Sequence, residues 1–210
     1  MRQLILASRN AGKIREFKRM MEQSAIDVEV LSLLDFPELP DVEETGTTLQ
    51  ENARLKAVEI TEATGKPCLA DDSGIFIDAL DGNPGVYSAR WSGVHGDDQA
   101  NNAKVLKEIH EKERVATNGQ VDRSAQFRCV VALSFPSDHQ RAGEVIFESG
   151  EMPGRIIDEP RGEHGFGYDP IFVPDGFSET SAELSAQEKD RISHRGQAMR
   201  KILPILAATL

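Results

Sequence analysis

Residues 3–22 read QLILASRNAGKIREFKRMME, and this stretch indicates the fold class. Gln3 to Ala7 is short and apolar, as in a buried strand, and Ser8 to Gly12 is polar, as in a turn. From Lys13 to Glu22 the apolar side chains recur at helical spacing, at Ile14, Phe17 and Met21. The chain is therefore predicted to open as strand, turn and helix.

The rest of the chain continues this alternation. A capping box of Thr48 and Glu51 predicts a helix running to about Thr64, and a second box of Ser185 and Glu188 opens the C-terminal region. Further helices are predicted over about 98–112 and 194–208, and strands over 28–33, 68–70, 75–80, 126–135, 144–149 and 171–173. Residues 71–74 are expected to form an acidic turn, and 136–143 a hairpin turn. Interleaved helices and strands favour an α/β protein with a mixed sheet.

Length and charge bound the possible functions. The chain has 210 residues, which suits one domain over 1–210, and 24 basic against 35 acidic side chains give a net charge of −11. A general binder of nucleic acid or of an anionic membrane would be net basic, so no such partner is expected. Cys68 and Cys129 stand in apolar stretches and are predicted to be buried free thiols. The first ten residues lack a signal-peptide core, so we expect a cytoplasmic protein.

The polar run Ser8 to Lys13 could bind phosphate. It lies between a predicted strand and helix, where backbone N–H groups and the positive end of the helix attract anions and Lys13 adds a charge. It lacks the glycine and hydroxyl positions of a Walker A loop. The alternative is that Asn10 only caps the helix and that Lys13 is solvated.

The acidic pair Asp71-Asp72, followed by Ser73, could bind a hard cation or activate water. Glu43 and Glu44, in the Pro-containing acidic loop 35–46, could supply further oxygen ligands. The alternatives are an ordinary acidic turn and a solvated glutamate pair.

Two later segments could recognise a flat polar ligand. Gly165 to Pro170 reads GFGYDP and places two aromatic rings on a glycine-rich backbone, which a flat ring could approach closely or which could simply form a buried turn. Lys189, His194 and Arg195 gather near a helix start and could donate to phosphate or keto oxygens, or face solvent.

Five ordered blocks together resemble the inosine/xanthosine triphosphate pyrophosphatase family. They are ASRNAGKIREF from Ala7, EETGTTLQENARLKA from Glu43, ADDSGIFIDALDGNPGVYSARWSG from Ala70, GFGYDPIF from Gly165 and AELSAQEKDRISHRGQA from Ala182. The resemblance implies an elongated mixed α/β fold of two lobes around a central cleft, usually as a homodimer. It also implies Mg²⁺-dependent hydrolysis of ITP, dITP or XTP to the monophosphate and pyrophosphate.

The resemblance also assigns residues. Asp72 would activate water and bind the metal, with Glu43 as its partner and Asp71 as a supporting carboxylate. The substrate would contact Ser8, Arg9, Asn10, Ala11, Gly12, Lys13, Ser73, Phe166, Gly167, Tyr168, Asp169, Lys189, His194 and Arg195. Two rival hypotheses are a nucleotide-binding regulator without turnover and a metal-dependent phosphomonoesterase, which would release orthophosphate.

Overall fold

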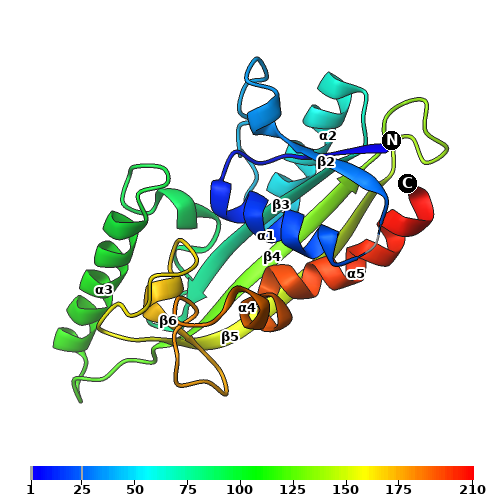
Figure 1. The fold of residues 1–210 in the computed structure, drawn as a ribbon. Coiled ribbons are helices and arrows are strands. Elements are labelled where there is room, and N and C mark those ends of the chain that lie inside the picture. The colour runs from blue at the N-terminus through cyan, green and yellow to red at the C-terminus, as the bar shows by residue number, and fades with distance from the viewer. Residues whose placement is uncertain (1, 25) are drawn as a thin grey trace. The chain divides into compact units, whose positions relative to one another are not determined.

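The computed structural model describes residues 2–24 and 26–210, and it contains a mixed sheet with flanking helices (Figure 1). The strands are β1 (Arg2–Leu6), β2 (Val28–Ser32), β3 (Cys68–Ile77), β4 (Ser124–Ser134), β5 (Val145–Ile156) and β6 (Phe172–Pro174). The helices are α1 (Ala11–Glu22), α2 (Leu49–Thr64), α3 (Asp98–Val115), α4 (Ala186–Ile192) and α5 (His194–Thr209), with short 3-10 turns η1 (Leu33–Asp35), η2 (Asp78–Leu80), η3 (Gly85–Arg90) and η4 (Asp169–Ile171).

The strand order in the sheet is β2-β1-β3-β4-β5-β6. β1 pairs in parallel with β2 and with β3, whereas β5 and β6 are antiparallel. The parallel pairs require crossovers, which α1 and α2 provide, and the segment 135–144 connects β4 to β5. The predicted mixed α/β class is confirmed.

The chain forms two compact units. The first comprises Met1–Asp72, Cys129–Gly150 and Arg195–Leu210, and the second comprises Ser73–Arg128 and Glu151–His194. A central cleft between two lobes stays a prediction.

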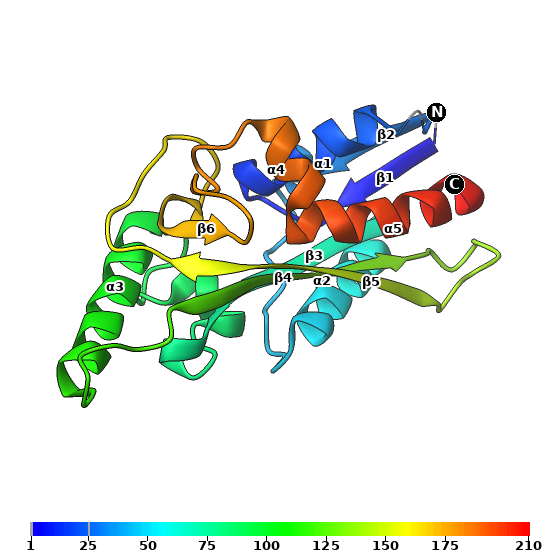
Figure 2. The same cartoon turned by 90° about the horizontal axis from the view of Figure 1, so that it is seen from below.

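In the first unit, helices cover both faces of the strands (Figure 2). Leu4, Leu6 and Leu69 pack in one apolar cluster with α1 and α5, while Ile5, Cys68 and Ala70 pack in another with α2. Successive side chains of a strand point to opposite faces, so alternate residues of β1 and β3 pack in the two different clusters. By the same alternation, Asp71 and Asp72 on β3 point to different faces.

In the second unit, α3 packs on one apolar cluster. Val105 and Ile109 of α3 are fully buried there with Ile75, Ile77 and Phe172. Both buried cysteines, Cys68 and Cys129, lie instead in the first unit and are free thiols, as predicted.

The predicted acidic turn at 71–74 is wrong. β3 runs without a break from Cys68 to Ile77, and both carboxylates are buried within it. Aspartate is depleted in strands, but neighbouring cations compensate these two charges, so tertiary contacts override the local preference. Gly74 is required in this strand because a Cβ there would lie 2.1 Å from the carbonyl oxygen of Gly85.

Other boundaries were predicted more closely. α2 carries the predicted capping box of Thr48 and Glu51 and ends at Gly65, which has φ +64°. The box of Ser185 and Glu188 is also present. β5 extends to Ile156, seven residues beyond the predicted strand, because residues 154–156 pair with β6. Gly154 allows this pairing, since a side chain there would clash with β6.

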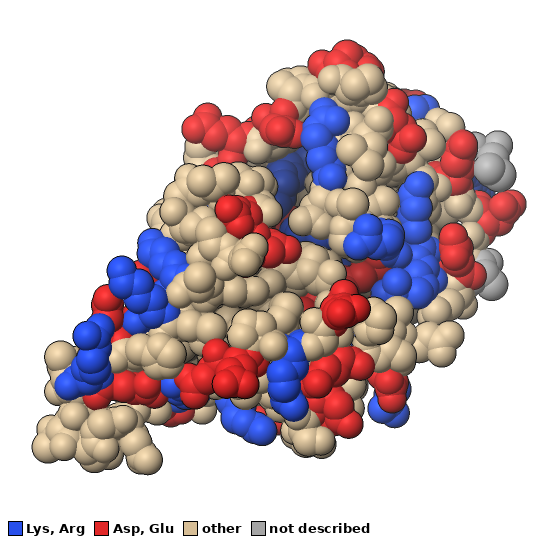
Figure 3. Space-filling view, turned by 60° about the vertical axis from the view of Figure 1, so that its left-hand side comes forward, with Lys and Arg blue, Asp and Glu red and all other residues tan. Residues whose placement is uncertain are grey.

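The face drawn in Figure 3 carries acidic and basic side chains intermixed. Among the described residues, no helix combines the length and the apolar character that crossing a membrane requires.

Candidate functional site

The run Ser8–Lys13 lies at the predicted strand-to-helix junction, and its last three residues form the start of α1, which begins at Ala11 instead of the predicted Lys13. Asn10 is the N-cap of α1, and its side-chain oxygen accepts a hydrogen bond from the Lys13 backbone N–H at 3.0 Å. Ser8 is buried, and its hydroxyl oxygen accepts from the Asn10 N–H at 3.2 Å. The cap and a phosphate site are compatible, because capping leaves the positive helix end in place.

Lys13 is not a solvated helix residue. Its side chain is 17% exposed, and its ammonium nitrogen lies 3.1 Å from Asp71 Oδ2. Asp71 also accepts from the Arg195 guanidinium at 3.0 Å, and Arg195 donates to Glu16 Oε2 at 2.5 Å. These four side chains form one ion network between β3, α1 and α5.

Charge compensation within this network decides the protonation of Asp71. Burial alone would raise the pKa of Asp71, but the charges of Lys13 and Arg195 outweigh it and hold that pKa well below its ordinary value. Arg195 is only 1% exposed, and the charges of Asp71 and Glu16 raise its pKa despite the burial. Asp71 is therefore ionised at neutral pH, and two cations, Lys13 and Arg195, contact it.

A second network surrounds Asp72, on the opposite face of β3. The Lys56 ammonium lies 2.8 Å from Asp72 Oδ1 and 2.8 Å from Glu44 Oε1. Asn52 donates to Asp72 Oδ2 at 3.3 Å, and its own side-chain oxygen accepts from the Gly46 N–H at 2.8 Å. α2 therefore holds the acidic loop and the β3 carboxylate together.

The pKa of Asp72 is shifted upward, unlike that of Asp71. Burial raises the pKa of Asp72, the charges of Lys56 and Lys13 oppose the rise, and the Glu44 charge adds to it. A carboxylate with a raised pKa is a better proton acceptor than an ordinary aspartate. Adjacent aspartates on one strand are therefore suited to different tasks.

Sequence reasoning missed Asn52 and Lys56. They are spaced i, i+4 on α2, so both extend from one helix face, and this polar pair among buried alanines was the available signal. The structure brings Glu44 into contact with Lys56, whereas Glu43 is exposed. Glu43 as the metal ligand stays a prediction.

The second unit contains the GFGYDP loop. Asp169 is buried, and its Oδ2 accepts from the Phe166 N–H at 2.8 Å and from the Lys189 ammonium at 2.5 Å. Gly165 has φ +76°, and a Cβ there would lie 2.1 Å from Asp169 Oδ2, so only glycine fits. The loop is thus bound tightly to α4 through Lys189.

The two aromatic rings of this loop have different environments. Tyr168 is 4% exposed and donates its hydroxyl to the Ser88 carbonyl oxygen at 2.8 Å. Phe166 is half-buried, and the Lys189 ammonium lies 5.0 Å from its ring centre. The backbone of Gly167 is held on both sides, by Asn102 and by Asp98. Phe166 is therefore the better placed of the two rings to meet a ligand.

Each unit thus assembles its own share of the predicted residues. The first unit gathers Lys13, Asp72 and Arg195, and the second gathers Phe166, Gly167, Tyr168, Asp169 and Lys189. His194 is buried and stacks on Phe127 at 4.9 Å, and Ser73 is half-buried after Asp72 on β3. The Arg9 guanidinium donates to carbonyl oxygens of the neighbouring loop, those of Leu33 and Leu39.

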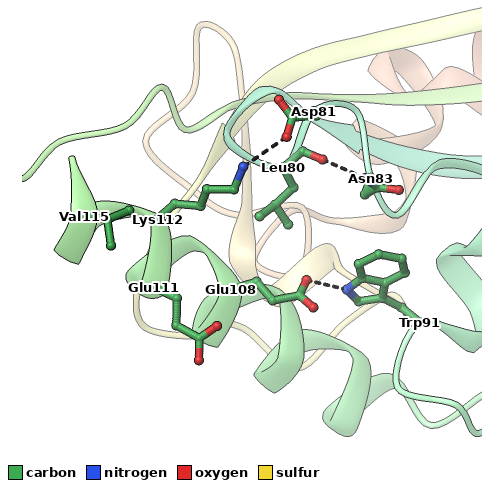
Figure 4. A pocket seen from close by; sticks show the side chains of 8 residues that line it. All are labelled: Leu80, Asp81, Asn83, Trp91, Glu108, Glu111, Lys112 and Val115. Carbon is green, nitrogen blue, oxygen red and sulfur yellow. Dashed lines mark hydrogen bonds and ion pairs between the residues drawn. The ribbon is translucent and has the colours of Figure 1, made fainter.

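A separate pocket in the second unit contains none of the predicted site residues (Figure 4). It has a volume of about 380 Å³. Three hydrogen bonds join its lining residues: Trp91 donates to Glu108 at 2.9 Å, Lys112 to Asp81 at 3.0 Å, and the Asn83 side chain to the Leu80 carbonyl oxygen at 2.9 Å. Its lining is Leu80, Asp81, Asn83, Trp91, Glu108, Glu111, Lys112 and Val115.

The fold and the charged site define an α/β protein with a buried carboxylate pair and a cation at a strand-to-helix turn. The sequence profile of the Ham1 family matches residues 4–205, and the chain belongs to that family. Relatives named dITP/XTP pyrophosphatase occur in Oceanobacillus iheyensis, 48% identical over 96% of this chain and 96% of the relative, and in Bacillus licheniformis, 46% identical over 98% of each.

Solved structures agree with this assignment. A HAM1 protein from Coxiella burnetii matches with a TM-score of 0.84 and 39% identity, covering 99% of this chain and 100% of that one. A nucleoside-triphosphatase from Mycobacterium abscessus, also called dITP/XTP pyrophosphatase, matches with a TM-score of 0.71 and 44% identity. The match covers 96% of this chain and 99% of that one.

Proposed function

We propose that this protein hydrolyses non-standard purine nucleoside triphosphates, namely dITP, XTP and ITP, between the α- and β-phosphates. The products would be the nucleoside monophosphate and pyrophosphate. Relatives named dITP/XTP pyrophosphatase, aligned along nearly the whole chain, support the substrate class. The observation that carries the chemistry is the buried Asp72 with its raised pKa, held by Lys56 and Asn52.

Asp72 is assigned as the base that accepts a proton from the attacking water. Its Oδ1 is fixed by Lys56 and its Oδ2 by Asn52, so the carboxylate has one defined orientation. Positioned general bases contribute about 10²–10⁴-fold to a rate. Lys13 lies at the positive end of α1 and is proposed to bind the triphosphate, because its positive charge attracts the negative phosphates.

Mg²⁺ is proposed as the cofactor. One ammonium lies 2.8 Å from oxygens of both Asp72 and Glu44, so this pair of carboxylates already attracts a cation. Within the described part of the chain, no cluster of three or more His, Cys, Asp or Glu is arranged to hold a metal. Mg²⁺ suits such a sparse site because it binds through one or two carboxylates plus substrate phosphates and water. When bound, it would neutralise developing charge on the phosphates.

The GFGYDP loop and Lys189 are proposed to recognise the base. Phe166 offers a ring for stacking, and the ammonium of Lys189 is a donor suited to a keto oxygen. An adenine amino group is a donor at the same position and cannot accept this hydrogen bond, at a cost of about 1–3 kcal/mol. We further propose that the protein acts as a homodimer in the cytoplasm, where the nucleotide pool is found.

The Asp72→Asn variant tests the assignment of the base. It keeps the size and the Asn52 contact of the side chain but cannot accept the proton. Pyrophosphate release from dITP is expected to fall about 10²–10⁴-fold, with dITP binding still measurable by calorimetry. Asp175→Asn, at an exposed position, is the matched control and should retain wild-type turnover. Wild-type turnover in Asp72→Asn would remove Asp72 as the base.

A further inference from the structure

Arg9 holds the acidic loop by its carbonyl groups. Nη1 donates to the Leu33 carbonyl oxygen at 2.6 Å, and Nη2 donates to the carbonyl oxygens of Leu39 at 2.5 Å and Phe36 at 3.4 Å. Nε donates to Asp41 Oδ1 at 2.8 Å. The guanidinium therefore bonds to four groups spread over residues 33–41.

The same loop leads to Glu44, whose carboxylate shares the Lys56 ammonium with Asp72. Glu44 follows Asp41 by three residues and reaches Lys56, which in turn bonds to Asp72. On its other side the loop is tied to the phosphate-binding run, because the Leu33 N–H donates to the Ser8 carbonyl oxygen at 3.3 Å. Arg9 thus lies between the predicted phosphate run and the segment that carries Glu43 and Glu44.

We propose that Arg9 is a positioning residue that holds the acidic loop so that its glutamates face the cation site at Asp72. This inference rests on the proposed function, and it differs from the substrate contact that sequence resemblance implies for Arg9. A planar guanidinium presents five donors in a fixed fork, which matches several carbonyl groups at once. A lysine ammonium is a compact point charge and cannot span residues 33–41 in this way.

The loop also has apolar anchors, which makes the test selective. Phe36, Leu39 and Val42 are partly buried against the cluster of α2, so loss of Arg9 should loosen the loop without unfolding the unit. Asp41 is 80% exposed, and its ion pair with Arg9 contributes little. The carbonyl contacts are what the variant must remove.

The first experiment is amide hydrogen exchange on the nucleotide-free protein, which requires no activity. In Arg9→Gln, the protection of the Phe36 and Leu39 amides, which donate to the Leu33 and Phe36 carbonyl oxygens, should fall about tenfold or more. Arg141→Gln is the matched control, since Arg141 has similar exposure and a carboxylate partner, Glu144, at 2.8 Å. Exchange over 33–46 should be unchanged in that control.

The second experiment measures cation affinity by titrating Mn²⁺ into the nucleotide-free protein and following it by electron paramagnetic resonance. The dissociation constant should rise about threefold or more in Arg9→Gln and should not be restored in Arg9→Lys. At saturating Mg²⁺ the KM for dITP should stay within about twofold of wild type, because the Arg9 guanidinium bonds to residues 33–41 and, in this proposal, not to the substrate.

Several outcomes would overturn the proposal. Unchanged exchange over 33–46, or a loosened loop with unchanged Mn²⁺ affinity, would show that Arg9 does not position the carboxylates. A raised KM for dITP that Arg9→Lys restores would make Arg9 a direct phosphate ligand. Absence of turnover in the wild type would refute the proposed function alone, because exchange and Mn²⁺ binding are measured without substrate.

Discussion

Replacing Lys56 by Met removes the cation that Asp72 and Glu44 share, while keeping most of the side-chain volume. The Lys56 side chain is 11% exposed, and its ammonium lies 2.8 Å from both carboxylates. Removing one partner of a buried ion pair costs about 3–5 kcal/mol, because the remaining charge is buried without compensation. The free energy of unfolding of Lys56→Met should therefore fall by about this amount at pH 7.

The loss should depend on pH. Without Lys56, the pKa of Asp72 rises further above its unfolded value, since the lysine charge is among the effects that restrain it. A carboxyl group with a raised folded pKa binds its proton more tightly in the folded state, so the stability of the variant falls as pH rises through that range. The difference from wild type should be larger at pH 8 than at pH 5.

Urea unfolding followed by circular dichroism measures both effects. Lys107→Met is the matched control on α3, because Lys107 is 75% exposed and 3.9 Å from Glu111, and its free energy of unfolding should change by less than about 0.5 kcal/mol. A loss below about 1 kcal/mol in Lys56→Met, independent of pH, would refute the buried ion pair.

Two further predictions separate substrate binding from stability and test the ion network around Asp71. Phe166→Ala should raise the KM for dITP about 5- to 150-fold, since stacking of a base is worth about 1–3 kcal/mol. Tyr168→Phe should mainly lower the free energy of unfolding, because the buried Ser88 carbonyl loses its donor. Steady-state kinetics and thermal unfolding compare the two, and equal KM effects would contradict the distinction. Asp71→Asn should cost about 3–5 kcal/mol at pH 7. Its folded pKa is lowered, so this contribution is present above the unfolded pKa of about 3.9, and the gap from wild type in urea unfolding should narrow as pH falls below that value. A gap that is constant from pH 7 to pH 3 would contradict it.

Local signals predicted the helices well. The capping box at Thr48 and the glycine at position 65 fix the ends of α2, because both act through hydrogen bonds or backbone conformations of neighbouring residues. The strand through Asp71 and Asp72 was not predictable in this way. The cations that make it possible include Arg195, 124 residues away in the sequence.

The candidate site was likewise predicted in its residues but not in its contacts. The order of the motifs identified Lys13, Asp72 and Arg195, yet the partners of Arg195 depend on packing of α5 against α1 and β3, with Glu16 lying 179 residues away. Lys56 was missed because a lysine on a helix is usually solvated, and only tertiary structure shows that it is buried between two carboxylates.

The central claim is the bond that is cleaved, and product analysis tests it most directly. The protein would be incubated with dITP, XTP, ITP, ATP or GTP, with and without Mg²⁺, and monophosphate, diphosphate, pyrophosphate and orthophosphate would be separated by ion chromatography. We predict monophosphate and pyrophosphate from dITP, XTP and ITP only, and only with Mg²⁺. Diphosphate with orthophosphate, or equal turnover of ATP, would contradict the proposed function.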